Sequence, residues 1–393
     1  MISSTQKIVK LILGLVLLSI VNHSCVDEYW PDIDSYDKLI VIDGMITNQP
    51  GPYEIRLSVS STISRPEQTP YSGAQVVVAD DIGNEEVFVE IAPGIYKNST
   101  DGLHGITGRK YKVIIRTPDE KEYASAFQEL QNPVKIANVY AEIESRETTD
   151  EFRTEYGYQF YIDSETAEKD STYLMWRAIG TYKYQSDFLI RYMYDRRVIT
   201  VFPQPDSFYT CYADDINTGI FTTDLSKLTS PGVIHFPLNF VNTDTRRLSI
   251  KYSLLVKQYT MSYDAYNYYS KLSDVNTQQG ALYAQQPYQI KGNVKNVLNE
   301  EEALLGYFIV SASDEKRIFV ERPPASQVKF YYGICEIDDG DFDAYKYIRT
   351  TPSNTWPLYV TTDAVGHRAL TDQSCVDCRR KGGSTDRPEY WVD

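Results

Sequence analysis

Short runs in which hydrophobic and polar residues alternate recur along the chain after residue 38. In the run from Tyr53 to Val59, Glu54, Arg56 and Ser58 separate hydrophobic side chains at every second position. Successive side chains of a β-strand point to opposite faces of the sheet, so this pattern predicts strands with one buried face. The early predicted strands cover 39–42, 53–59, 74–79, 87–91, 110–116 and 123–124.

Turn-forming residues divide these early strands. Pro and Gly cluster at 50–52, Gly83 follows an aspartate pair, and a further corner begins at Pro118. Short strands that alternate with turns about every ten residues are typical of a β-sandwich. We therefore predict an immunoglobulin-like or transthyretin-like β-sandwich over 38–132, with a domain boundary at Asn132 and Pro133.

Longer strands rich in tyrosine follow this boundary. They are predicted at 156–162, 173–184, 250–256, 306–311 and 328–335. The predicted fold class is mainly β, with the first sandwich followed by a larger β-rich domain over 133–393 that contains one or two helices.

One segment of the larger domain has helical periodicity, near 262–279. Ser262 is a suitable N-cap, Asp264 lies in the first turn, and Gly280 ends the pattern. One stripe of this helix, expected to pack on the sheet, contains Ala265, Tyr266, Tyr269 and Leu272.

Residues 1–24 have the pattern of an export signal. Lys7 and Lys10 precede an apolar core that is too short to span a bilayer, which takes about 20 residues. Ser24 is the small residue expected before a cleavage site, and Cys25 follows it directly. A cysteine at this position is the lipid acceptor of bacterial lipoproteins, so we predict a lipid anchor at Cys25. The alternative is a soluble exported protein.

An acidic tether is predicted over 25–37. Asp27 and Glu28 lie immediately behind the predicted anchor. Such an acidic pair resembles the signal that sends lipoproteins of the Bacteroidetes group to the cell surface. The alternative interpretation is a solvated spacer without a sorting role.

The composition argues against two classes of protein. With 42% hydrophobic and 13% aromatic residues, the chain can offset the entropy that folding costs, so it is not expected to be disordered. The 54 acidic and 39 basic residues give a formal charge of -15. Without a basic stripe, the chain is not expected to bind the phosphate backbone of a nucleic acid.

The four remaining cysteines are Cys211, Cys335, Cys375 and Cys378. In an oxidising compartment they are interpreted first as two disulfides, for which three connectivities are possible. Cys375 and Cys378 form a C-x-x-C motif that would indicate zinc or redox chemistry in a cytosolic chain. Zinc or free thiols are the alternatives, and we expect the disulfides to staple the C-terminal segment.

No catalytic motif stands out in the sequence. His104, His235 and His367 are isolated, and none accompanies a nucleophile elbow. Pairs of carboxylates for glycoside hydrolysis are available among the many acids, but a solvated acidic surface is the preferred interpretation. We therefore predict no catalytic residue and no cofactor.

The densest acidic cluster contains Asp338, Asp339, Asp341 and Asp343. Such oxygen ligands suit Ca²⁺, although their spacing departs from that of an EF-hand loop. An exposed loop is the preferred interpretation and calcium binding the alternative.

The chain contains 33 tyrosines. Tyrosine provides a large, rigid contact surface at low entropic cost, which suits recognition, but it also suits the margin of a sandwich core. The predicted ligand or partner contacts are Tyr182 and Tyr184 on a strand, and Tyr263 and Tyr268 away from the apolar stripe of the helix.

Several blocks of the sequence resemble one bacterial family. They are Val41–Gly44 near the start, Pro287–Val294 with the pattern P-x-x-x-x-G-N, Leu304–Phe308 with L-G-Y-F, and Cys375–Trp391, which begins C-x-D-C-R. Together they resemble the Bacteroidetes lipoprotein family DUF4249, whose function is unknown. The resemblance implies a lipid-anchored outer-membrane protein, often encoded beside a TonB-dependent transporter, and it supplies no catalytic residue.

From these observations we expect a surface-exposed, non-enzymatic outer-membrane lipoprotein that serves a TonB-dependent transporter as a binding or accessory subunit. Its expected partners are an outer-membrane β-barrel and, through the acylated Cys25, the lipid bilayer. The alternatives are a subunit of an outer-membrane assembly or secretion complex and, third, a polysaccharide or peptide hydrolase.

Overall fold

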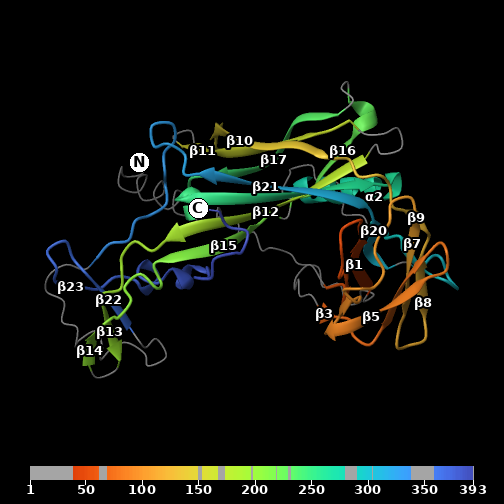
Figure 1. Ribbon diagram of the computed structural model, residues 1–393, viewed down its shortest axis with the longest axis horizontal. Helices are drawn as coiled ribbons and strands as arrows, with labels where there is room; N and C mark the ends of the chain where they lie inside the picture. Colours follow the sequence, from red (N-terminus) through yellow and green to blue (C-terminus); the bar gives the residue numbers. More distant parts are fainter. Residues whose placement is uncertain are drawn as a thin grey trace, which may run out of the picture. The chain divides into compact units, whose positions relative to one another are not determined.

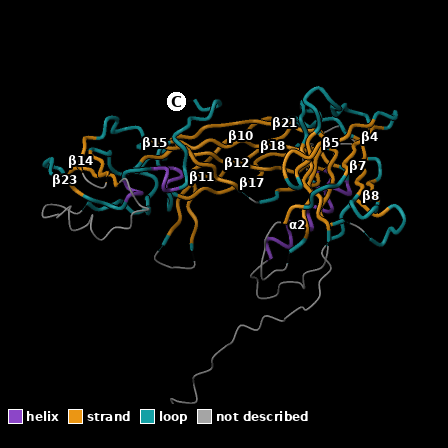
Figure 2. Tube along the Cα trace, turned by 90° about the horizontal axis from the view of Figure 1, so that it is seen from below, coloured by secondary structure: helices purple, strands orange, loops and turns teal. Residues whose placement is uncertain are grey.

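Strands form most of the regular structure in the computed structural model (Figures 1 and 2). The residues that it describes are 39–61, 69–148, 153–166, 173–195, 198–217, 219–228, 232–278, 290–302, 304–337 and 358–392. The mainly β fold class predicted from the sequence is thereby confirmed.

The first sheet contains the strands predicted for the early part of the chain. Their bounds are β1 Ile40–Ile46, β2 Glu54–Val59, β3 Thr69–Pro70, β4 Gln75–Asp80, β5 Glu85–Ala92, β6 Ile95–Lys97, β7 Lys110–Arg116, β8 Glu122–Ser125 and β9 Gln128–Glu129. Two later strands, β19 Val294–Asn296 and β20 Leu305–Val310, complete an 11-stranded sheet. Its main path runs in the order β19-β8-β7-β4-β5-β6-β2-β1-β20.

Strands from both halves of this path bury their apolar faces in one core, as the two layers of a sandwich do. Ile42 and Ile55 come from one half, and Val76 and Val113 come from the other. Phe308 of β20 joins the same core. The sandwich is therefore built from residues on both sides of the boundary predicted at Asn132 and Pro133.

A glycine permits the close pairing of β20 with β1. The two strands are parallel, and Gly306 is paired with Ile42. Gly306 has a φ of +79°, and a Cβ added there would lie 1.9 Å from the Ile42 carbonyl oxygen. Only a residue without a side chain fits this conformation and this distance.

Two further sheets pack face to face. One contains β10 Ile136–Glu147, β11 Thr154–Ser164 and β17 Val233–Asn242, and the other contains β12 Tyr173–Gln185, β15 Thr210–Ile216, β16 Phe221–Asp224, β18 Lys251–Met261 and β21 Ala312–Glu321. Their shared core includes Phe160, Trp176 and Leu254. The Trp176 indole Nε1 donates a hydrogen bond to Gln258 Oε1 at 2.8 Å, which satisfies both buried polar groups.

The α-helix α2, Tyr263–Gln278, confirms the predicted helix. Ser262 caps it, since the Ala265 backbone N–H donates to Ser262 Oγ at 3.3 Å. Ala265 and Tyr269 are buried against Tyr307 of β20 and Met261 of β18. The helix therefore packs against strands of both the first sandwich and the second.

The C-terminal part forms a small sheet with β13 Tyr192–Asp195, β14 Val198–Val201, β22 Leu358–Thr362 and β23 Arg368–Ala369. The short 3₁₀-helices η4 Gln373–Cys375 and η5 Cys378–Lys381 follow, and two others, η1 Leu225–Lys227 and η2 Arg246–Leu248, lie earlier in the chain. Near its end the tail buries Trp391 against the rings of Tyr212 and Phe319, at centroid distances of 5.0 and 5.5 Å.

Two disulfides fix the C-terminal part. Cys211 is bonded to Cys378, and Cys335 is bonded to Cys375. Of the three connectivities open from the sequence, the structure has the one in which the two cysteines of the C-x-x-C motif bond to different distant partners. The motif thus ties the tail to β15 and to the segment around Cys335.

The prediction of a buried strand over 328–335 is wrong. Val328 is buried, but most side chains after it are exposed or half-buried, and the segment has no strand pairing. Its aromatic rings pack on cationic side chains instead: Arg322 lies over the Phe330 ring at 3.8 Å and Arg246 over the Tyr332 ring at 5.1 Å. A run of aromatic residues therefore does not require a sheet.

Candidate ligand-binding pocket

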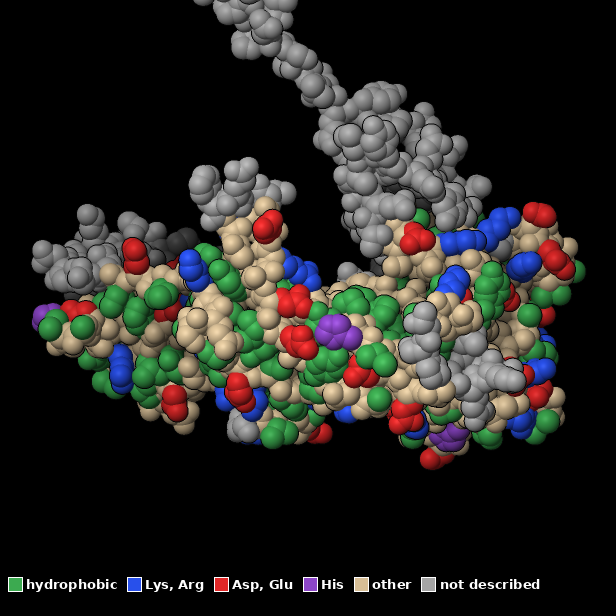
Figure 3. Space-filling model, turned by 90° about the horizontal axis from the view of Figure 1, so that it is seen from above, with side chains coloured by type: hydrophobic (Ala, Val, Ile, Leu, Met, Phe, Trp, Pro, Cys, Tyr) green, Lys and Arg blue, Asp and Glu red, His purple; other side chains and the backbone are tan. Residues whose placement is uncertain are grey.

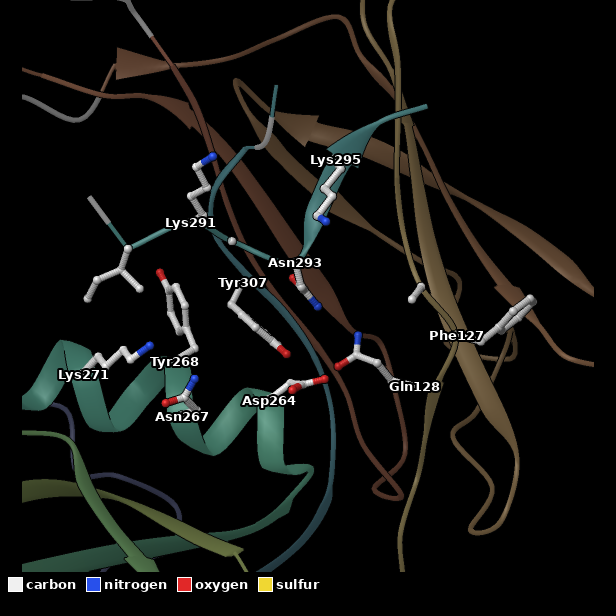
Figure 4. A pocket seen from close by; sticks show the side chains of 13 residues that line it. Phe127, Gln128, Asp264, Asn267, Tyr268, Lys271, Lys291, Asn293, Lys295 and Tyr307 are labelled. Atoms are coloured by element: carbon white, nitrogen blue, oxygen red, sulfur yellow. The ribbon is translucent and has the colours of Figure 1, made fainter. Parts of the chain in front are cut away.

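A pocket of about 560 Å³ lies between α2 and the first sandwich (Figure 4). Helix α2 contributes Asp264, Asn267, Tyr268 and Lys271. The remaining lining residues come from three strand-associated segments: Ala126, Phe127, Gln128, Ile290, Lys291, Gly292, Asn293, Lys295 and Tyr307. The volume is within the range of small-molecule sites.

Backbone groups of Phe308 in β20 fix two amide side chains of the pocket. Asn293 Nδ2 donates to the Phe308 carbonyl at 2.8 Å, and the Phe308 N–H donates to Asn293 Oδ1 at 2.9 Å. Gln128 Nε2 donates to the same carbonyl at 3.1 Å. Two of the blocks that resemble DUF4249, one ending in Gly292, Asn293 and Val294 and the other ending in Phe308, thus meet at the pocket.

Two tyrosines form an aromatic wall. The rings of Tyr268 and Tyr307 lie 4.9 Å apart between centroids. Burial raises the pKa of each hydroxyl above its ordinary value, so both stay protonated at neutral pH. Figure 4 shows the Tyr307 hydroxyl directed toward the part of the pocket where Asp264 and Gln128 lie, while Phe127 points away.

Three lysines, Lys271, Lys291 and Lys295, give the pocket a local positive charge. Among the described residues of the lining Asp264 is the only acid, so their formal charge is three minus one, or +2. The chain as a whole carries -15. On the face shown in Figure 3, acidic and basic side chains are interspersed and do not form a single basic stripe.

The four predicted contact tyrosines have different environments. Tyr268 lines the pocket, and Tyr263 is exposed by 60%, with its ring 5.6 Å from that of Tyr173. Tyr182 is half-buried and packs at the margin of two cores.

Tyr184 lies in the core, contrary to the prediction that it contacts a ligand or partner at the surface. Its side chain is 1% exposed, and its hydroxyl donates to the Cys378 carbonyl at 2.7 Å. Burial raises its pKa to about 12. Because the ring is enclosed and the hydroxyl already has a partner, Tyr184 offers no surface to a ligand.

Of the residues that line the pocket, the sequence analysis predicted only Tyr268 as a contact, and the lysines and Gln128 are among those that it missed. Lys291 directly precedes the Gly292–Asn293 pair of the family-like block, and Lys295 follows two residues after that pair. A cation on each side of the Gly292–Asn293 pair was the available signal. Gln128 had no such signal, because its position depends on a contact with Phe308, which is distant in the sequence.

Other predicted sites lie partly or wholly outside the described residues. This holds for Cys25, for Asp27 and Glu28, and for the calcium candidates Asp338, Asp339, Asp341 and Asp343. Among the described residues, Asp187 lies near the sulfurs of Cys335 and Cys375, with the three potential ligand atoms within 4.8 Å. Those sulfurs are bonded to each other, so neither is a thiolate available to a metal.

The fold and pocket define a mainly β, two-sandwich protein with a small-molecule-sized cavity. Residues 26–317 match the family described as Domain of unknown function (DUF4249), and the chain belongs to this family. The match ends before the tail block at 375–391. No curated protein matches the sequence. Within the described part of the chain, no helix has the length and apolar character needed to cross a bilayer.

Proposed function

We propose that the protein is a surface-exposed, lipid-anchored outer-membrane protein that serves as a binding or accessory subunit of a TonB-dependent transporter. One observation supports the proposed lipid anchor: the DUF4249 match begins at residue 26, directly after Cys25. The family region thus starts one residue after the first residue of the proposed mature chain. Acyl chains on Cys25 would hold that chain at the membrane.

The two disulfides support an extracytoplasmic location. Disulfides persist in oxidising compartments and are rare in the reducing cytosol. Cys211 and Cys378 are fully buried, and their bond connects a strand of the second sandwich with the tail. A protein stabilised in this way suits the exterior of a cell.

The pocket supports a role in capture. It combines cationic, amide and hydroxyl groups on a scaffold of strands and one helix, which holds their positions. The transporter partner itself is inferred from the family resemblance, which often places such lipoproteins beside a TonB-dependent transporter.

Affinity isolation of the intact protein from detergent-solubilised outer membranes tests the partner. We expect a stoichiometric β-barrel partner that carries a plug domain. A matched preparation of an unrelated outer-membrane lipoprotein controls for barrels that copurify nonspecifically. Recovery of the protein with an assembly or secretion complex, or without any barrel, would contradict the proposal.

A further inference from the structure

The inner part of the pocket presents hydrogen-bond acceptors. Because Gln128 Nε2 donates to the Phe308 carbonyl, the amide is fixed and its Oε1 is left as a free acceptor. That oxygen is buried and has no hydrogen-bond partner among the described residues. An unpaired buried acceptor is unfavourable, so a ligand that donates a hydrogen bond to it binds more tightly than one that does not. The Asp264 carboxylate points to the same region (Figure 4).

The rest of the lining presents cations from separate elements. Lys271 projects from α2, Lys295 from β19, and Lys291 from the segment before β19. Of the three, Lys291 has a described acid within 4 Å, Glu301 at 3.7 Å, whose carboxylate is 91% exposed. No described acidic side chain lies within that distance of Lys271 or Lys295. In an acidic protein, this arrangement concentrates positive potential at the pocket.

From acceptors inside and cations around them, we infer that the pocket binds an acidic saccharide, a ligand that carries both hydroxyl groups and carboxylates. Hydroxyls donate to Gln128 Oε1 and Asp264, and carboxylates pair with the lysines. The neutral side chains of Asn267 and Tyr268 also line the pocket and suit a hydroxyl-rich ligand.

An ammonium ligand fits the same acceptors less well. The lining carries a formal charge of +2, three lysines against Asp264, and therefore repels a cation. A simple dicarboxylate pairs with the lysines but leaves Gln128 Oε1 without a donor. The lysines together with the unpaired acceptor of Gln128 therefore favour an anion that is also rich in hydroxyl groups. This assignment rests on the proposed binding role and specifies its ligand class.

Titration calorimetry of the intact purified protein in detergent tests the inference. The probes are trimers of galacturonate, mannuronate and guluronate, the methyl esters of the same trimers, and glutarate. We expect at least one uronate trimer to bind, its neutral ester to bind at least tenfold more weakly, and glutarate to bind at least tenfold more weakly. Raising the salt concentration should weaken binding of the charged trimer.

Variants then place the ligand in the pocket. The double variant Lys271→Gln/Lys295→Gln should lose at least tenfold in affinity for the charged trimer, and Gln128→Met should lose affinity for both trimer and ester. Lys329→Gln is the matched control, because Lys329 is exposed and lies outside the pocket lining, and it should bind as wild type. Thermal unfolding verifies that each variant is folded.

The inference is overturned if none of the trimers binds, if the ester or glutarate binds as well as the trimer, or if either the double variant or Gln128→Met binds as wild type. These outcomes are distinct from failure of the proposed function. A protein that is membrane-bound and isolates with its barrel but binds no uronate leaves the partner proposal standing. A protein that binds uronate but isolates without a barrel supports the pocket alone.

Discussion

Single polar side chains hold together the segments that form the pocket. Glu302 precedes β20, and its Oε1 accepts hydrogen bonds from Lys121 Nζ and the Tyr123 hydroxyl, both at 2.7 Å. Its Oε2 accepts from Asn296 Nδ2 at 2.9 Å. These donors, Lys121 first among them, hold the pKa of Glu302 below its ordinary value of 4.5. One carboxylate thereby connects β8, β19 and the approach to β20.

The lowered pKa of Glu302 predicts a pH-dependent contribution to stability. A carboxyl whose pKa is lower in the folded state stabilises the protein above pH 4.5, and this contribution is lost as the pH falls through the folded-state pKa. Glu302→Gln should lower the free energy of unfolding by about 1 kcal/mol at pH 7, and by progressively less below about pH 4. Urea unfolding at several pH values measures the free energy of unfolding of the wild type, of Glu302→Gln and of the control Glu300→Gln. Equal destabilisation at pH 7 by Glu300→Gln, at an exposed neighbouring position, would contradict this role.

The tyrosines show the limit of sequence reasoning at this scale. The alternation around Tyr184 predicted a strand, and that strand is present as β12. Whether a tyrosine on it faces a ligand or the core depends on the neighbouring segments, and here Cys378 and the tail cover Tyr184. Tyr268, by contrast, lies at the pocket because β20 places Tyr307 beside it. Neither neighbour is close in the sequence.

At the scale of elements, period and capping residues predicted the helix and ten of the 23 strands that the structure describes, because both signals are local. The predicted range 110–116 coincides with β7, and Ser262 caps α2 as expected. Pairings between distant segments leave no such signal. Nothing in the pattern before Asn132 indicated that β20 would pair in parallel with β1 or that β19 would extend the opposite edge through β8. The prediction of a strand at 328–335 was wrong because its aromatic residues fit the pattern of a buried strand but pack on arginine side chains instead.

The disulfides that tie the tail should differ in their effect on stability. The Cys211–Cys378 bond spans 167 residues and the Cys335–Cys375 bond spans 40. In the chain-entropy model these loops correspond to about 5 and about 4 kcal/mol respectively. The double variant Cys211→Ala/Cys378→Ala should therefore be destabilised more than Cys335→Ala/Cys375→Ala, measured by urea unfolding.

Peptide mapping under non-reducing conditions tests the same connectivity directly. We expect peptides that link Cys211 to Cys378 and Cys335 to Cys375. A link between Cys375 and Cys378, or alkylation of either in the native protein, would be incompatible with the tail as described.

At the scale of the whole molecule, the proposal is that an anchored chain presents a rigid β-scaffold and a charged pocket to an extracellular ligand. Two sandwich cores and two disulfides provide the rigidity. The pocket lies where α2 meets the first sandwich, and two strands from beyond the predicted boundary help to complete that sandwich. The candidate pocket thus depends on an arrangement that no single stretch of sequence encodes.

Membrane fractionation of a Cys25→Ala variant tests the central claim most directly. Wild-type protein should sediment with the outer membrane, and the intact mass of its mature chain should include acyl groups. Cys25→Ala should appear in the soluble fraction, because the attachment site is lost. Cys335→Ala/Cys375→Ala, which lacks two other cysteines, should stay in the membrane. Retention of Cys25→Ala in the outer membrane at the wild-type level would contradict the account.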